Sequence, residues 1–225
     1  YKVTQLHIYK LQIYRTEPRG PGCSFYKNQG IKKQKKIQNP KTSNLTKPVL
    51  KALYTNTDNS LASKLDELKV TLASENSKYD FICITEIKPK SGNTPDPELL
   101  HLDGYELHVN TAYSSDDTRG VAIYVKQDLN AKLIRNDISS QFEDALWLEI
   151  PSPQKENLLI GCIYRSGSPT KAVKHDANLH KMMIHMATDA GYKDVLMVGD
   201  FNHPHILWTP APVVTANHND NHPDV

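Results

Sequence analysis

Apolar and polar positions along residues 50–100 follow the pattern of a strand, a helix and a second strand. Apolar residues fall at alternate positions of "LKALYT", which predicts a strand over residues 50–55. Leucines then recur on one helical face, at Leu61, Leu65, Leu68 and Leu72. Asp58 or Ser60 is available as the N-cap of that helix. "YDFICITE" follows as a short run of β-formers, so a parallel strand pair with a helical crossover is predicted.

Four further apolar runs predict strands: "YELHVN", "GVAIYVK", "ALWLEI" and "NLLIGCIYR". The last three have no helical pattern between them, and we expect them to be antiparallel neighbours. A second helix is predicted across residues 168–191, with Ser168 as its cap, Pro169 in its first turn and Gly191 just past its end. Its buried stripe is predicted at Leu179, Met183, Met186 and Ala190. "DVLMVGDFN" closes the pattern as a strand, so the chain is predicted to be a mixed α/β sheet protein.

Charge divides the chain unequally. Residues 1–48 carry eleven Lys and Arg against one acid, whereas residues 49–225 carry sixteen against twenty-four acids. Residues 1–47 are therefore predicted to be a basic, disordered segment ahead of the domain. Its lysines could attract the phosphates of nucleic acid, and the candidates are Lys32, Lys33, Lys35 and Lys36. A solvated tail, or sequence that is not native to the domain, stays open as the alternative.

Several classes of protein do not fit this sequence. No stretch approaches the ~20 apolar residues that a membrane span needs, and the N-terminus lacks the apolar core of a signal peptide. Cys83 and Cys162 lie inside apolar runs and are expected to be reduced core residues. The cysteines and histidines do not have zinc-site spacing. An intracellular protein, of the nucleus or the cytoplasm, is therefore expected.

Polar residues of a particular kind follow three of the predicted strands. Asn56 ends the first strand, Glu86 follows the second, and Asp200 and Asn202 follow the last. Ligands of α/β sheet proteins gather beyond the carboxyl ends of strands. Two carboxylates and two amides would suit Mg²⁺, which often takes one or two carboxylates and keeps several waters. The pattern alone leaves open that Glu86 is a solvated strand end and that Asn56 is a turn residue.

Five segments occur in an order that resembles the endonuclease/exonuclease/phosphatase family: "LYTNTDNSLASKLDELK", "YDFICITEIKP", "RGVAIYVK", "LLIGCIYRSGSP" and "DVLMVGDFN". These motifs are most similar to those of the endonuclease domains that non-LTR (LINE-type) retrotransposons encode beside a reverse transcriptase. The resemblance covers residues 48–209 and excludes residues 1–47, and residues 210–225 are expected to be an irregular tail. It implies a four-layer α/β sandwich of mixed sheets, C-terminally truncated here.

The resemblance also implies roles for single residues. Asn56 and Glu86 match residues at the metal, which is expected to be Mg²⁺, with Mn²⁺ as a possible substitute. Asp200 matches the acid that activates the attacking water, and Asn202 the amide that holds the phosphate. Tyr164 matches a phosphate-contacting tyrosine. Arg165 follows it in the same segment and is a further candidate for contact with nucleic acid, while Arg119 and Gly120 match a structural turn.

The chain departs from the family pattern after "GDFN". The family carries an Asp–His pair well downstream, and no such segment is present in residues 203–225. The histidines of this stretch are expected to be solvent-exposed rather than catalytic; they are His203, His205, His218 and His222. The first hypothesis is therefore a Mg²⁺-dependent DNA endonuclease with impaired activity. An inactive, element-derived module that binds nucleic acid or protein, and a phosphatase of small phosphoesters, stay open as alternatives.

Overall fold

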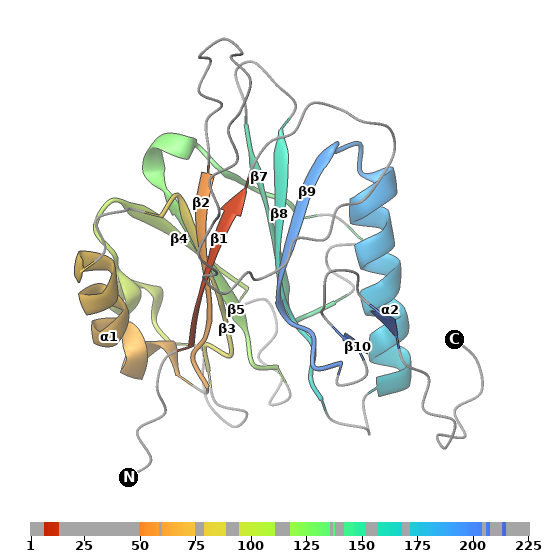
Figure 1. The fold of residues 1–225 in the computed structure, drawn as a ribbon, viewed down its shortest axis with the longest axis horizontal. Helices are drawn as coiled ribbons and strands as arrows, with labels where there is room; N and C mark the ends of the chain where they lie inside the picture. The colour runs from red at the N-terminus through yellow and green to blue at the C-terminus, as the bar shows by residue number, and fades with distance from the viewer. Residues whose placement is uncertain are drawn as a thin grey trace, which may run out of the picture.

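Two mixed β-sheets lie face to face at the centre of the molecule, and one helix covers the outer face of each (Figure 1). The structure is a computed structural model. It describes residues 7–13, 50–58, 60–74, 79–88, 95–110, 118–135, 137, 142–151, 157–167, 172–203, 206–207 and 213–214. Figure 1 shows α1 (Leu61–Ser74) and α2 (Ala172–Ile184) on opposite outer sides, with the strands between them. The result is a four-layer α/β sandwich.

The first sheet has five strands in the order β1-β2-β3-β5-β4. Their bounds are β1 His7–Ile13, β2 Leu50–Asn56, β3 Phe81–Thr85, β4 Tyr105–Val109 and β5 Val121–Lys126. β2 and β3 are parallel and the other pairs are antiparallel. The predicted parallel pair with a helical crossover is confirmed, because α1 connects β2 to β3.

The second sheet has four strands in the order β6-β7-β8-β9. Their bounds are β6 Lys132–Leu133, β7 Ala145–Ile150, β8 Leu158–Tyr164 and β9 Asp194–Asp200. β8 and β9 are parallel, again with a helix between them in sequence, and the other pairs are antiparallel. Short elements complete the described part: the 3₁₀ turns Pro97–Leu100 and Gln127–Leu129, and the strand pair β10 Ile206–Leu207 and β11 Val213–Val214.

Three apolar clusters hold the four layers together. The central cluster lies between the sheets and includes Phe81, Ile123, Leu148 and Ile160. Leu61, Leu65 and Leu68 of α1 pack on the first sheet, and Leu179, Met182 and Met186 pack on the second sheet around Trp147. Burial of these clusters is the main stabilising contribution to the fold.

The predicted pairing of β5 with β7 is wrong. β5 lies between β3 and β4 in the first sheet, whereas β7 pairs with β6 and β8 in the second. Both strands are almost fully buried. An apolar run that is buried on both faces carries no alternation, so its sequence does not show which sheet it joins. The predicted antiparallel pairing of β7 with β8 is confirmed.

A strand before residue 48 is a second difference from prediction. β1 pairs antiparallel with β2 along its whole length, from His7 opposite Asn56 to Ile13 opposite Leu50. Tyr9, Leu11 and Ile13 fall at alternate positions, which is a strand pattern that the high net charge of residues 1–47 obscured. The rest of the basic segment, including its lysine run, lies outside the described residues.

The helices begin and end close to the predicted positions. The Ser60 side chain accepts a hydrogen bond from the backbone N–H of Ser63 and thereby caps α1. A π turn, His185–Asp189, continues α2, and Gly191 follows with φ +79°. Met182 rather than Met183 is fully buried. Ser168 and Pro169 lie outside the described residues. Among the helices of the described residues, none is long and apolar enough to cross a membrane.

Candidate active site

The carboxyl ends of three strands meet at one edge of the sandwich. Asn56 ends β2, and Glu86 directly follows β3, so the parallel pairing of these strands brings both residues to the same edge. Asp200 ends β9 of the opposite sheet. A polar cluster therefore forms where the two sheets face each other.

Asn56 connects the two acids of this cluster. Its Nδ2 donates to Glu86 Oε1 at 2.8 Å and to Asp200 Oδ2 at 3.2 Å. Its Oδ1 accepts the backbone N–H of Asp58 at 2.8 Å. The structure thus brings together three of the predicted site residues. The amide nitrogen of Asn56 faces the carboxylates while its amide oxygen accepts a backbone bond, and its role at a metal stays a prediction.

Glu86 forms an ion pair with Arg119, whose guanidinium Nη2 donates to Glu86 Oε2. The two side chains are only 13% and 8% exposed. Glu86 has φ +59°, a left-handed conformation that costs a non-glycine residue ~1 kcal/mol or more. Its carbonyl accepts the Thr57 hydroxyl at 2.9 Å, which helps to hold that conformation. The turn that was expected to be purely structural therefore also supplies a cation to the site.

Asp144 holds the turn that carries Arg119. Its Oδ1 accepts the backbone N–H groups of Arg119 at 3.1 Å and Gly120 at 2.7 Å. Burial raises the pKa of Asp144 to about 6, although these two hydrogen bonds act in the opposite direction. The sequence analysis missed Asp144, because an acid in front of a strand has no distinguishing pattern.

Gly199 lets the end of β9 lie against β8. A Cβ at this position would be 1.7 Å from the carbonyl oxygen of Ile163, and φ is +154°. Asp200 is consequently paired with Tyr164 in the β8–β9 register. Burial, and then the carboxylates of Glu86 and Asp200, raise the pKa of Tyr164 to about 12 against an opposing effect of Arg119. The phenol is therefore neutral and able to donate a hydrogen bond at neutral pH.

Asn202 lies in the turn after Asp200, in the left-handed conformation with φ +45°. Its backbone N–H donates to Asp200 Oδ1 at 3.1 Å, and its side-chain Nδ2 donates to the carbonyl oxygen of Arg165 at 2.7 Å. The guanidinium of Arg165 contacts Asp176 and the Asn202 carbonyl, and its contact with nucleic acid stays a prediction. The other predicted nucleic-acid contacts, Lys32, Lys33, Lys35 and Lys36, lie outside the described residues.

The donor set fits a hard divalent cation. Two carboxylates lie within 3.2 Å of one amide nitrogen, and Mg²⁺ often binds proteins through one or two carboxylates and several waters. In the part of the chain that the structure describes, no group of three or more acidic, histidine or cysteine side chains is placed so that it could hold a metal ion. The two carboxylates Glu86 and Asp200 are the candidates for such an ion.

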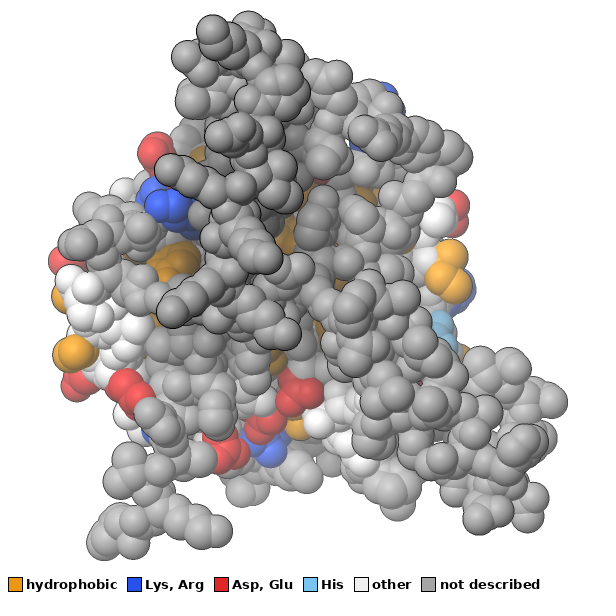
Figure 2. Space-filling model, viewed as in Figure 1, with side chains coloured by type: hydrophobic (Ala, Val, Ile, Leu, Met, Phe, Trp, Pro, Cys, Tyr) orange, Lys and Arg blue, Asp and Glu red, His pale blue; other side chains and the backbone are white. Residues whose placement is uncertain are grey.

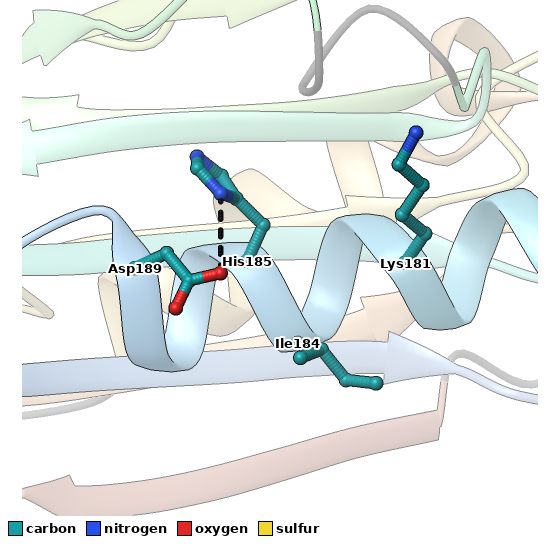
Figure 3. Close-up of a pocket in the computed structure, with 4 residues that line it drawn as sticks. All are labelled: Lys181, Ile184, His185 and Asp189. Carbon is teal, nitrogen blue, oxygen red and sulfur yellow. Dashed lines mark ion pairs between the residues drawn. The ribbon is translucent and has the colours of Figure 1, made fainter.

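A pocket on the surface of α2 does not bring together carboxylates from different strands. Lys181, Ile184, His185 and Asp189 line a pocket along α2 and its π turn, where His185 Nδ1 lies 3.6 Å from Asp189 Oδ2 (Figure 3). All four side chains come from one continuous helical segment. Groups from several strands do not converge there, so the strand-end cluster is the better candidate for catalysis.

Charged side chains of both signs lie side by side at the lower edge of the face that Figure 2 shows, among the described residues. Beside the cluster, Arg119 pairs with Glu86 and Arg165 pairs with Asp176.

The sequence model described as "Endonuclease/Exonuclease/phosphatase family" matches residues 53–221, which is most of the chain. This range contains Asn56, Tyr164 and Asp200 together with Glu86 and Asn202. No curated protein sequence matches the chain.

Solved structures with a similar chain path share little sequence with this protein. Humanized D. rerio TDP2 has 16% identity and a TM-score of 0.47, over 68% of this chain and 63% of that one. The endonuclease domain of TRAS1, a telomere-specific non-LTR retrotransposon, has 16% identity and a TM-score of 0.45, over 67% and 58%. The AP endonuclease LMAP from Leishmania major has 14% identity and a TM-score of 0.48, over 65% of this chain and 53% of that one. The chain thus spans less than two thirds of each.

Proposed function

We propose, since the chain belongs to the endonuclease/exonuclease/phosphatase family, that it is a Mg²⁺-dependent phosphodiester hydrolase and that its substrate is DNA. One observation carries the proposal. The amide of Asn56 lies within hydrogen-bond distance of both Glu86 and Asp200, which come from opposite sheets. Two carboxylates gathered at strand ends are suited to metal-assisted hydrolysis, and this gathering is not needed for packing.

Glu86 is the proposed principal metal ligand. Bound Mg²⁺ would supply Lewis-acid polarisation of a phosphate oxygen and compensate for charge that develops on it. Arg119 and Asn56 hold the two oxygens of the Glu86 carboxylate from different directions, and this fixes its orientation. Mn²⁺, which also accepts oxygen ligands, is expected to substitute.

Asp200 is the proposed base for the attacking water. Asn56 donates to its Oδ2 and the Asn202 N–H donates to its Oδ1, so both oxygens are oriented by neighbouring groups. A carboxylate held in this way can accept the proton of a water molecule as that water attacks phosphorus. The scissile P–O bond breaks on the opposite side. The leaving oxygen takes a proton from solvent water and becomes the hydroxyl end, the other product carries the phosphate, and Asp200 returns its proton to solvent.

Asn202 and Tyr164 are the proposed hydrogen-bond donors to the phosphate. One N–H of the Asn202 side-chain amide donates to the carbonyl oxygen of Arg165. Its second N–H is the proposed donor to a phosphate oxygen. The neutral phenol of Tyr164 supplies another donor. Donors fixed before the reaction stabilise developing negative charge at little reorganisation cost.

DNA is proposed as the substrate because the motif order resembles the endonucleases of non-LTR retrotransposons. In a parent element of that type, a reverse transcriptase would accompany this domain. The excess of Lys and Arg in residues 1–48 also favours a polyanionic partner.

The test is plasmid nicking at neutral pH with Mg²⁺, Mn²⁺ or EDTA. Supercoiled DNA should be nicked with either metal and not with EDTA, and both Glu86→Ala and Asp200→Ala should abolish nicking. A chromogenic phosphomonoester, assayed in parallel, should not be hydrolysed. Negligible nicking by all three proteins would contradict the hydrolase and favour a binding module, whereas hydrolysis of the phosphomonoester alone would favour a phosphatase.

A further inference from the structure

Arg165 connects three parts of the chain that meet beside the candidate active site. It directly follows β8, and its backbone N–H donates to the carbonyl oxygen of Asp200 at 2.8 Å. Its Nη1 donates to the carbonyl oxygen of Asn202 at 2.9 Å. Its Nε and Nη2 donate to the two carboxylate oxygens of Asp176, in α2, at 2.7 and 2.8 Å. One side chain thus links β8, α2 and the turn after β9.

The Arg165–Asp176 pair is well formed and largely shielded from water. The side chains are 11% and 23% exposed. Burial acts to raise the pKa of Asp176, but the hydrogen bonds and charge of Arg165 outweigh it, so the pKa is lowered. A bidentate guanidinium–carboxylate pair fixes direction as well as distance, which lysine cannot reproduce. The guanidinium donates to three acceptor atoms within the protein, two on Asp176 and one on Asn202.

The residue that this pair holds is Asn202. Arg165 bonds it twice, since its guanidinium donates to the Asn202 carbonyl and its own carbonyl accepts the Asn202 amide. Asn202 has a positive φ, and its side chain lies beside Gly167, where an added Cβ would be 3.7 Å from Asn202 Cβ. A substitution of Arg165 would remove the guanidinium bond to the Asn202 carbonyl, which helps to hold the left-handed turn, whereas the backbone carbonyl that accepts the Asn202 amide would remain.

We propose that Arg165 and Asp176 are a positioning pair that orients the Asn202 amide toward the substrate phosphate. The proposal rests on the proposed hydrolase function and concerns how its phosphate donor is held. Asp176 fixes the plane of the guanidinium, the guanidinium fixes the Asn202 carbonyl, and the Arg165 carbonyl fixes the amide. A role of this kind affects the transition state, so its loss lowers kcat and leaves KM for DNA nearly unchanged.

The kinetic test compares Arg165→Lys and Asp176→Asn with the control Asp80→Asn. Asp80 forms a similarly shielded ion pair with Lys126, but it lies at the other end of β3 from Glu86. Single-turnover nicking should be ~10–100-fold slower in both site variants, with KM within about twofold of the parent protein, as for other residues that orient ligands in metal sites. The control should lose stability but keep its rate.

A second measurement keeps the proposal separate from the hydrolase function. The side-chain amide of Asn202 is followed by ¹H–¹⁵N NMR and identified by its absence in Asn202→Asp. Its signals should shift, and its hydrogen exchange should accelerate, in Arg165→Lys and Asp176→Asn but not in Asp80→Asn. This result would support the positioning pair even if the parent protein did not nick DNA. Absence of nicking would then contradict only the proposed hydrolase function.

Two outcomes would overturn the positioning pair. One is an unchanged Asn202 side-chain signal in both site variants. The other is an Arg165→Lys variant with unchanged kcat, a raised KM and a salt dependence of DNA binding reduced by about one phosphate contact, which would identify Arg165 as a direct contact with DNA.

Discussion

Replacement of Asn56 by aspartate tests the geometry of the strand-end cluster without changing side-chain volume. Asn56→Asp exchanges an amide nitrogen, 2.8 Å from Glu86 Oε1 and 3.2 Å from Asp200 Oδ2, for a carboxylate oxygen. Two favourable hydrogen bonds become two repulsive contacts. Two like charges 4 Å apart repel by about 4 kcal/mol at an effective dielectric constant of 20. Arg119 offsets part of this repulsion, so we expect the free energy of unfolding to fall by about 3 kcal/mol at pH 7.

The loss should depend on pH. The introduced carboxyl group faces two acids and will hold its proton to higher pH in the folded protein than in the unfolded chain. Unfolding then releases a proton, so the variant loses stability relative to the parent protein as pH rises and recovers stability toward pH 4. Urea unfolding of both proteins between pH 4.5 and 8 measures the difference directly.

Asn157→Asp is the matched control for this substitution. Asn157 Nδ2 donates to one carboxylate, Glu149 Oε1, at 3.0 Å, away from the candidate site. One repulsive contact instead of two should give a smaller loss and a weaker pH dependence. If Asn56→Asp were as stable as the parent protein from pH 4.5 to 8, Glu86 and Asp200 would not share the Asn56 amide and the proposed cluster would be refuted.

Three further predictions follow from contacts around the site and in the second sheet. The free energy of unfolding of the parent protein should fall by roughly 3 kcal/mol as pH rises from 4 to above 6, because burial raises the pKa of Asp144 to about 6 in the folded state. Urea unfolding of Asp144→Asn should lack this pH-dependent loss, and an identical pH profile in both proteins would contradict the prediction. Arg119→Met should bind Mn²⁺ about tenfold more weakly by calorimetry, because the Glu86 carboxylate loses one of the two bonds that orient it. Equal or tighter binding would show that Arg119 does not orient the metal ligand. Gly161→Ala should lower the free energy of unfolding by ~1–3 kcal/mol and alter the near-ultraviolet circular dichroism, because the added Cβ would be 2.5 Å from Cζ3 of the Trp147 ring. An unchanged spectrum and Tm would argue against that contact.

The sequence predicts α1 and β3 well for different reasons. The leucine stripe of α1 has clear helical periodicity, whereas β3 is a continuous run of β-formers that is too short for a helix. The parallel pairing of β2 with β3 follows from the helix between them. β5 and β7 are buried on both faces, so their sequences contain no signal for the choice of sheet. β1 has an alternating pattern, but its basic surroundings favoured a disordered segment.

The sequence predicts which residues make up the site better than it predicts how they contact one another. Strand-end positions and the family resemblance identified Asn56, Glu86 and Asp200, which the structure brings into hydrogen-bond distance. Neither reveals that the Asn56 amide nitrogen faces the acids, since that depends on the Asp58 backbone. The partner of Arg165 is eleven residues away on a helix, and a guanidinium looks the same in sequence whether it binds phosphate or carboxylate.

The most direct test of the central claim compares two substitutions that each remove one carboxylate. Asp200→Asn changes the strand-end cluster, whereas Asp80→Asn changes an ion pair at the opposite end of β3. Single-turnover nicking of supercoiled plasmid with Mg²⁺ is measured for both, with folding confirmed by circular dichroism. We predict a loss of at least ~10³-fold for Asp200→Asn and less than about twofold for Asp80→Asn, in line with removal of a group that acts on the transition state. Equal rates in the two variants would contradict the assignment of hydrolysis to the strand-end cluster.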